Sequence, residues 1–196
     1  MPQQERHGGR GTLVAVVGPS GVGKDTLMGA ALSHFGERDD LHLVQRMITR
    51  PVDAGGEHHQ AVEHCEFEAL RAAGAFAVSW DAHGLSYGIP AHVREKLALG
   101  HLVIANGSRS ALPRFAEVFD PLLVINIVAR PEVLAERLEK RGRETREEIL
   151  ARLKRGSLEV CGPFEVVTID NSEDLATASR RMIETLAPLL GDRSPA

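Results

Sequence analysis

Aromatic residues are scarce in this chain of 196 residues, where one Trp, one Tyr and six Phe make up 4% of the sequence. Proteins that bind single-stranded nucleic acids stack the bases on aromatic side chains, and few such side chains are available here. The net charge of -4 also provides no overall positive field for a phosphate backbone. We therefore expect no nucleic acid partner.

Cysteines and long apolar runs are few as well. Cys65 and Cys161 form neither a CxxC pair nor a zinc-ligand spacing, which favours free thiols in a reducing compartment over disulfides. No apolar run approaches the roughly 20 residues that cross a bilayer. These absences, together with the polar N-terminal segment, predict a cytoplasmic protein without a membrane partner.

Short apolar runs alternate with longer helix-like segments between polar tails at residues 1–11 and 191–196. This alternation is typical of an α/β fold, in which helices flank a mainly parallel central sheet. A single domain over residues 12–190 is the expected organisation. The expected strands are 13–17, 41–44, 76–79, 102–105, 123–128 and 166–169, and the expected helices are 24–35, 63–73, 90–99, 110–119, 131–141 and 172–190.

The segment GPSGVGK at residues 18–24 lies between the first expected strand and the first expected helix. This is the sequence and the context of a phosphate-binding loop, or P-loop, in which glycines let backbone N–H groups face the phosphates and Lys24 reaches the outer ones. The loop predicts a P-loop NTPase fold that binds a nucleoside triphosphate, which we take to be ATP. The residues expected to bind it are Gly18, Pro19, Ser20, Gly21, Val22, Gly23, Lys24, Asp25 and Thr26.

One residue departs from the usual P-loop. The position after Lys24 normally carries a Ser or Thr hydroxyl for Mg²⁺, but here it is Asp25, and Thr26 follows. Asp25 could bind the ion through water, or Thr26 could supply the hydroxyl while Asp25 orients waters. The sequence leaves both arrangements of the Mg²⁺ site open.

P-loops are shared by GTPases, motors and kinases, so other residues must indicate the reaction. The NKxD guanine signature of GTPases is absent from the sequence. Arg46 and Arg50 instead stand on either side of Thr49 at the expected end of the second strand, where they could face a phosphorylated acceptor. This pair favours a kinase.

Over nearly its whole length the chain resembles the guanylate kinase family. The resemblance runs through the P-loop, Thr49-Arg50, Gly56-Glu57, AAGAF at 72–76, Tyr87-Gly88 and RLEKRGRETREEILARL at 137–153. It implies phosphoryl transfer by a guanylate kinase-like fold with two insertions. These are an acceptor-binding region at about 46–90 and a lid at about 137–152.

The acceptor-binding residues depart from those of guanylate kinases, because Asp53 stands where the second arginine of the clamp is expected and Asn106 where an acidic residue is expected. Five short blocks instead resemble the ribose 1,5-bisphosphate phosphokinase family. They are GKD at 23–25, ITRPxxAGxExH at 48–59, SWxAxGLxYG at 79–88, NGSR at 106–109 and RGRE at 141–144. That resemblance implies ATP-dependent phosphorylation of a small molecule, ribose 1,5-bisphosphate, to 5-phosphoribosyl diphosphate in phosphonate catabolism.

The resemblance also implies roles for single residues, since cations must hold two polyanions in line. Lys24 would hold the β and γ phosphates of ATP with Mg²⁺, and the other expected catalytic residues are the lid arginines Arg137, Arg141 and Arg143. The acceptor phosphates are expected to meet Arg46, Arg50 and Arg109. The remaining expected acceptor contacts are Thr49, Glu57, His59, Tyr87, Asn106 and Ser108.

Other interpretations remain open at this point. A guanylate kinase acting on GMP would share the fold and the lid, whereas a non-catalytic guanylate kinase-like binding module would share the fold alone. Zinc bound by His58, His59, His64 and Cys65 is a further alternative, although their spacing fits no standard zinc pattern. The oligomeric state is open as well, with a homodimer as one candidate.

Overall fold

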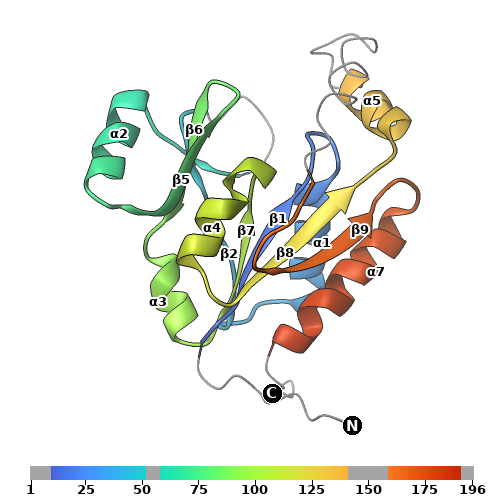
Figure 1. The fold of residues 1–196 in the computed structure, drawn as a ribbon. Helices are drawn as coiled ribbons and strands as arrows, with labels where there is room; N and C mark the ends of the chain where they lie inside the picture. The colour runs from blue at the N-terminus through green and yellow to red at the C-terminus, as the bar shows by residue number, and fades with distance from the viewer. Residues whose placement is uncertain (1–9, 52–57, 141–158, 191–196) are drawn as a thin grey trace.

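The computed structural model describes residues 10–51, 58–140 and 159–190 (Figure 1). The C-terminal tail, most of the N-terminal tail, and most of the predicted lid lie outside this described part. So do three predicted site residues, Glu57, Arg141 and Arg143. Of the described helices, none is both long enough and apolar enough to span a membrane.

Five parallel strands form the central sheet, in the order β2-β7-β1-β8-β9. The strands are β1 (Leu13–Val17), β2 (Leu41–Leu43), β7 (Leu102–Asn106), β8 (Leu122–Val128) and β9 (Glu165–Asp170). Both ends of each strand lie within one residue of the ends of an expected strand. Their runs are apolar because crossover helices bury both faces of a parallel sheet.

Helices cover both faces of this sheet (Figure 1). On one face lie α1 (Lys24–Phe35) and α7 (Leu175–Leu186), the latter continued by the 3-10 turn η3 (Ala187–Leu189). On the other face lie α3 (Val93–Ala98) and α4 (Leu112–Val118), the latter preceded by the 3-10 turn η2 (Arg109–Ala111). The helix α5 (Pro131–Glu139) follows β8.

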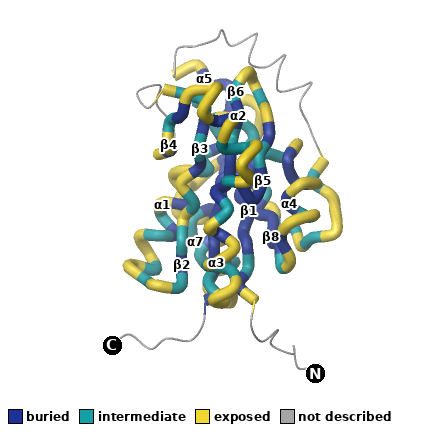
Figure 2. Tube along the Cα trace, turned by 90° about the vertical axis from the view of Figure 1, so that its left-hand side faces the viewer, coloured by how far each residue is buried: buried dark blue, intermediate teal, exposed yellow. Residues whose placement is uncertain are grey.

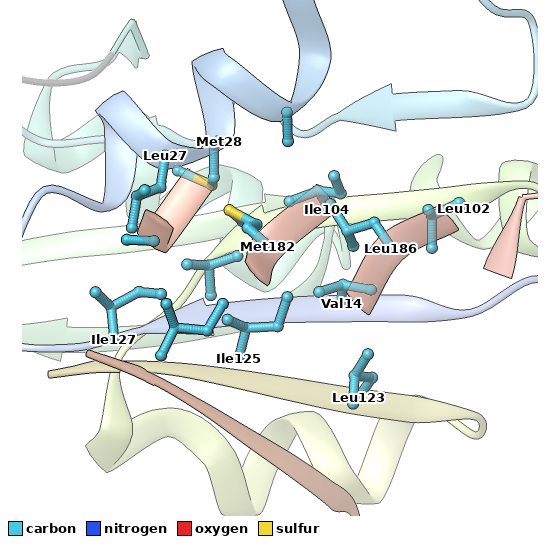
Figure 3. Packing of buried hydrophobic residues seen from close by; sticks show 14 of the residues in the cluster. Val14, Leu27, Met28, Leu102, Ile104, Leu123, Ile125, Ile127, Met182 and Leu186 are labelled. Carbon is cyan, nitrogen blue, oxygen red and sulfur yellow. The ribbon is translucent and has the colours of Figure 1, made fainter. Parts of the chain in front are cut away.

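The alternation of side chains along β1 divides the core into two layers. Val14 and Val16 belong to the layer beneath α1 and α7 (Figure 3). Leu13, Ala15 and Val17 belong to the layer on the other side, with residues of α3 and α4. All five side chains are fully buried, so β1 is fixed at the centre of the molecule and holds the start of the P-loop.

A second sheet was not expected from the sequence. Its strands, in spatial order, are β4 (Gln60–Ala61), β3 (Met47–Ile48), β6 (Leu85–Pro90) and β5 (Phe76–Ala82). The expectation that residues 76–79 form a strand of the parallel sheet is wrong, because β5 pairs with β6 in an antiparallel hairpin. The two turn residues, His83 and Gly84, have positive φ, and so short a turn returns the chain antiparallel to itself.

The second sheet also changes the expected position of two arginines. The central strand β2 ends at Leu43, and Arg46 and Arg50 instead flank β3 of the second sheet. β3 pairs in parallel with β4 and antiparallel with β6. Both arginines are therefore carried by the second sheet, and their placement at the end of the second central strand is wrong.

The second sheet packs between the central core and α2 (His64–Ala72). This helix corresponds to the one expected at residues 63–73. Val78 and Trp80 join the core layer of α4, while Phe67 of α2 stacks on Phe76 with ring centroids 4.6 Å apart. Gly88 of β6 lies against the same ring, and a Cβ there would come within 2.4 Å of Phe76. Glycine is therefore required beside Tyr87 for this packing.

The loops after β1, β7, β8 and β9 all leave the central sheet at its carboxyl edge, where open α/β sheets bind their ligands. In Figure 1 the loop after β1 lies between the second sheet on one side and α5 on the other. Figure 2 shows β1 as a buried strand running up to this edge. The fold thus brings the P-loop, the second sheet and α5 together.

His42 of β2 and His101 form a pair away from this edge. Nε2 of His42 lies 2.8 Å from Nδ1 of His101, and the two rings stack with centroids 5.0 Å apart. Burial lowers the pKa of His42, and the positive charges of Lys96 and His101 lower it further. The folded state therefore resists protonation of His42.

We expect this resistance to make the free energy of unfolding depend on pH. In the unfolded chain His42 takes up a proton near the ordinary histidine pKa of 6.5, whereas in the folded chain it takes up the proton only at lower pH. The contribution of His42 to the free energy of unfolding is then fully present above pH 6.5. It is lost as the pH falls below 6.5 toward the lowered pKa of His42 in the folded state. Urea unfolding between about pH 8 and pH 5 measures the slope, which should be shallower in His42→Asn. His83→Asn, at the exposed β5–β6 turn, is the control, and an unchanged slope in His42→Asn would contradict the prediction.

Candidate active site

The P-loop follows β1 and ends at Lys24, the first residue of α1. Gly21 and Gly23 have φ values of 82° and 93°, in the left-handed region that favours glycine. Gly23 is the N-cap and supplies no side-chain cap, so the first N–H groups of α1 are available to an anion. Nζ of Lys24 donates to the carbonyl oxygens of Gly18 at 3.0 Å and Pro19 at 3.3 Å. The loop thus has the geometry of a phosphate cradle.

Asn171, directly after β9, supports the P-loop, a role that the sequence interpretation missed. Its Nδ2 donates to the carbonyl oxygen of Val22 at 2.8 Å, and the residue is 2% exposed. A Cβ at Gly23 would lie 2.6 Å from the same Nδ2, so the loop and Asn171 fit closely. In the sequence, residues 169–172 indicate first a strand end with a helix N-cap and second a nucleotide contact, but the N-cap of α7 is Asp174. Only its position at the carboxyl edge of the sheet could have pointed to Asn171.

Asp25 and Asn106 connect the start of α1 to the end of β7. Nδ2 of Asn106 donates to Oδ1 of Asp25 at 3.0 Å, and Asn106 is buried. Asp25 and Thr26 are both exposed on the first turn of α1. A carboxylate and a hydroxyl beside Lys24 are the hard oxygen donors that Mg²⁺ takes together with phosphate oxygens. The donor set therefore fits a magnesium ion that arrives with a nucleotide.

The described residues contain no group of three or more His, Cys, Asp or Glu side chains that could hold a metal ion by themselves. His58 is exposed and its ring lies 3.2 Å from Nε2 of Gln45, while His64 and Cys65 are exposed at the start of α2. A separate zinc centre at these residues finds no support in this geometry.

α5 packs directly over the P-loop and carries Arg137. A Cβ at Gly21 would lie 3.0 Å from Cδ2 of Leu138, so the helix and the loop are in close contact. Nη1 of Arg137 is buried and has no hydrogen-bond partner among the described residues. A cavity of about 350 Å³ at this point is lined by Gly21, Gly23, Thr26, Arg137, Lys140, Asn171 and Leu175. Arg137 thus shares a cavity with the P-loop, as the lid hypothesis requires.

Arg46 packs against two aromatic rings of the second sheet. Its guanidinium carbon lies 5.0 Å from the ring centroid of Tyr87 and 5.6 Å from that of Trp80. The two rings are themselves stacked, 5.3 Å apart and nearly parallel. Arg46 is 8% exposed, so these cation–π contacts fix a largely buried positive charge. The structure thereby brings together two predicted acceptor residues, Arg46 and Tyr87.

Arg50 is held by His59, and Thr49 has a role in the sheet. Nη2 of Arg50 lies 3.2 Å from Nδ1 of His59, and Nε2 of His59 lies 3.0 Å from the carbonyl oxygen of Arg50. Thr49 accepts a hydrogen bond at Oγ1 from the backbone N–H of Ser86 at 2.8 Å and donates its own N–H to the carbonyl of Ser86. Thr49 therefore ties the turn that carries Arg50 to β6.

Ser108 and Arg109 follow β7 next to the P-loop strand. The N–H of Gly107 donates to the carbonyl of Val16 at 2.8 Å, which fixes this turn against β1. Oγ of Ser108 shares a hydrogen bond of 2.9 Å with Oγ of Ser110. Burial lowers the pKa of Arg109, whose Nε has no hydrogen-bond partner in the described part of the chain. A partly desolvated cation thus lies beside the end of β1.

Three predicted arginines share an unusual feature. Arg50, Arg109 and Arg137 each have a buried N–H group without an acceptor among residues 10–51, 58–140 and 159–190. Arg71 has one too, but its guanidinium already pairs with the carboxylates of Asp81 and Glu68. Buried donors in folded proteins are nearly always paired with protein groups, water or ligands, so these three arginines offer N–H groups that an anion could accept from.

Comparison with known proteins decides the family. The sequence profile described as Guanylate kinase matches residues 10–186, which is most of the chain. This chain belongs to the guanylate kinase family. The predicted fold class, a P-loop α/β fold with a parallel central sheet flanked by helices, is thereby confirmed.

Within the guanylate kinase family, curated relatives place the chain more closely. It is 55% identical to a protein of Agrobacterium fabrum named ribose 1,5-bisphosphate phosphokinase PhnN, over 93% of this chain and 100% of the relative. A Rhizobium etli protein of the same name is also 55% identical, over 93% of each chain. A Brucella melitensis protein of that name is 44% identical over 90% of this chain and 92% of its own. The chain is therefore a kinase of the ribose 1,5-bisphosphate phosphokinase family, and the resemblance predicted from five short blocks is confirmed.

Solved structures agree on the fold of the family. The guanylate kinase of Anaplasma phagocytophilum superposes with a TM-score of 0.66 at 17% identity, covering 94% of this chain and 89% of that one. A gluconokinase of Sinorhizobium meliloti superposes with a TM-score of 0.52 at 22% identity, covering 92% and 93%. At these identities the likeness concerns the fold alone.

Proposed function

We propose that this kinase transfers the γ-phosphoryl group of ATP to the 1-phosphate of α-D-ribose 1,5-bisphosphate, as a step in phosphonate catabolism. The products are 5-phospho-α-D-ribose 1-diphosphate and ADP. The names of curated relatives of nearly equal length support this acceptor. The observation that carries phosphoryl transfer between two polyanions is the set of buried N–H groups without acceptors on Arg50, Arg109 and Arg137.

The reaction needs positive charge more than it needs a base. An oxygen of the 1-phosphate forms a bond to the γ-phosphorus while the bond from that phosphorus to the β–γ bridging oxygen breaks, and ADP leaves with that electron pair. The attacking oxygen is already anionic, so no strong base is required, and the obstacle is repulsion between the two phosphate groups. Buried cations in a water-poor site reduce this repulsion most effectively.

The nucleotide side of the site consists of the P-loop and α5. Lys24 and the first N–H groups of α1 bind the β and γ phosphates, and Arg137 faces them from the shared cavity. Asp25 and Thr26 would hold Mg²⁺, which would supply positive charge to offset that of the phosphates of ATP. Asn106 holds the carboxylate of Asp25 in a fixed direction.

The acceptor side consists of the second sheet and the turn after β7. Arg46, Arg50 and Arg109 bind the two phosphates of the acceptor, and Tyr87 and Ser108 contribute to the sugar site. Glu57 and the lid arginines Arg141 and Arg143 complete the site in this proposal, on the strength of the family resemblance. The partner is a small molecule in the cytoplasm. Neither nucleic acid nor membrane takes part, and a homodimer is compatible with this function.

A coupled assay of ADP release with ATP and Mg²⁺ tests the function. We expect turnover with ribose 1,5-bisphosphate, a product with the mass of 5-phospho-α-D-ribose 1-diphosphate, and only background with GMP or without acceptor. The expected preference follows from the departures from guanylate kinases, because Asp53 stands where the second arginine of the clamp is expected and Asn106 where an acidic residue is expected. Turnover with GMP at a comparable rate would overturn the assignment of the acceptor, and a reaction without enzyme gives the background rate.

A further inference from the structure

We infer that His59 is a positioning residue that fixes the guanidinium of Arg50, and that it does not contact the sugar acceptor. The inference rests on the proposed function, because Arg50 is assigned there to an acceptor phosphate. It revises the expectation that His59 itself binds the acceptor.

Both ring nitrogens of His59 are engaged by Arg50. A carbonyl oxygen can only accept, so Nε2 of His59 must carry the proton that it donates to the carbonyl of Arg50 at 3.0 Å. A guanidinium can only donate, so Nδ1 must present its lone pair to Nη2 of Arg50 at 3.2 Å. A neutral imidazole has one donor and one acceptor, and both are used. With His59 only 5% exposed, the ring has no free polar atom for a sugar hydroxyl.

The position of His59 is set by the second sheet. β4 begins at the next residue, and the N–H of Gln60 donates to the carbonyl of Arg46 at 2.8 Å. β4 pairs in parallel with β3, the strand that Arg50 follows. Backbone pairing therefore places a buried imidazole against a long and otherwise flexible side chain.

Two glutamates near Arg50 could compete with His59 for its guanidinium. A cavity of about 420 Å³ is lined by Arg50 together with Glu63 and Glu66, near the start of α2. Carboxylates attract a guanidinium, yet the described structure contains no ion pair between Arg50 and either glutamate. The contact with Nδ1 of His59 holds Nη2, while Nε stays buried and without a partner among the described residues. Arg50 is thus prepared for an anion.

A double-mutant cycle on the full-length kinase tests this inference. We expect His59→Ala to raise the KM for ribose 1,5-bisphosphate about tenfold and to leave the KM for ATP unchanged, because Arg50 loses its fixed geometry. In an Arg50→Ala background the same change should have almost no further effect on this KM, since His59 acts on the acceptor through Arg50. His59→Gln should restore most of the affinity, because an amide can both accept and donate. His58→Ala, which removes an exposed neighbouring ring, is the matched control and should change neither KM.

Additive effects of His59→Ala and Arg50→Ala would show that His59 acts independently of Arg50 and would overturn the inference, as would an unchanged KM in His59→Ala. Nitrogen-15 NMR of the wild-type imidazole provides a readout without substrate and without variants. We expect a protonated Nε2 and an unprotonated Nδ1, and the opposite tautomer would refute the arrangement.

If the wild type phosphorylates another acceptor, the proposed function fails, but the double-mutant cycle can be run with that acceptor. The two failures are therefore distinguishable.

Discussion

Lys24→Ala is expected to lower kcat by about 10²- to 10³-fold, which corresponds to a loss of about 2.7 to 4 kcal/mol of transition-state stabilisation. In the structure Nζ of Lys24 donates to the carbonyl oxygens of Gly18 and Pro19 in the P-loop, at 3.0 and 3.3 Å. Under the proposed function it would provide a charge-assisted donor to the β and γ phosphates of ATP. The coupled assay at saturating ATP and acceptor measures the effect.

The control for Lys24→Ala must separate lost chemistry from lost structure. Lys96→Ala removes a lysine from α3, on the other face of the central sheet and away from the P-loop, and should leave kcat unchanged. Lys24→Ala itself should keep the melting temperature close to that of the wild type, since Lys24 is only partly buried and its hydrogen bonds to Gly18 and Pro19 lie within the P-loop. A folded Lys24→Ala protein that keeps wild-type kcat would refute the role of this residue.

The central sheet could be predicted because its information is local. The run Leu13–Val17 is apolar throughout, and the GPSGVGK motif separates it from a helix at Lys24–Phe35 whose bounds match the prediction. The second sheet could not be predicted in the same way. β3 and β4 have two residues each, too few to show a period, and they are strands only because they pair with each other and because β3 also pairs with β6.

The candidate site also contains residues that local sequence predicts and residues whose roles depend on distant parts of the chain. The P-loop residues and the arginines could be predicted as candidates because glycine spacing and charge are visible in short segments of sequence. The roles of Asn171 and His59 depend on partners far away in the chain or on hydrogen-bond geometry, such as the contact of Asn171 with Val22 across 149 residues. Sequence identified His59 as a site residue, but only the structure shows that both of its nitrogens are turned toward Arg50.

Arg137→Ala should also reduce kcat strongly, by about 10² to 10³, while the KM for ATP changes much less. The expected pattern follows from the position of Arg137, which shares the P-loop cavity and has a buried Nη1 without an acceptor in the described chain. Under the proposed function, this donor would gain an acceptor as negative charge develops on the transferred phosphoryl group. Arg137→Lys should recover only part of the activity, because a lysine keeps the charge but loses the planar arrangement of donors.

Lys140→Ala is the matched control, since Lys140 lines the same cavity one helical turn away but is exposed and pairs with Glu136 at 2.8 Å. If the cavity needed only positive charge, both substitutions would reduce kcat to a similar extent. If it needs a buried donor directed at the phosphates, Arg137→Ala will be far more harmful than Lys140→Ala, and single-turnover rates will show it in the chemical step. An Arg137→Ala protein with unchanged kcat and a raised KM for ATP would instead make Arg137 a ground-state contact. The comparison therefore separates transition-state stabilisation from nucleotide binding at the one predicted lid arginine that the structure describes.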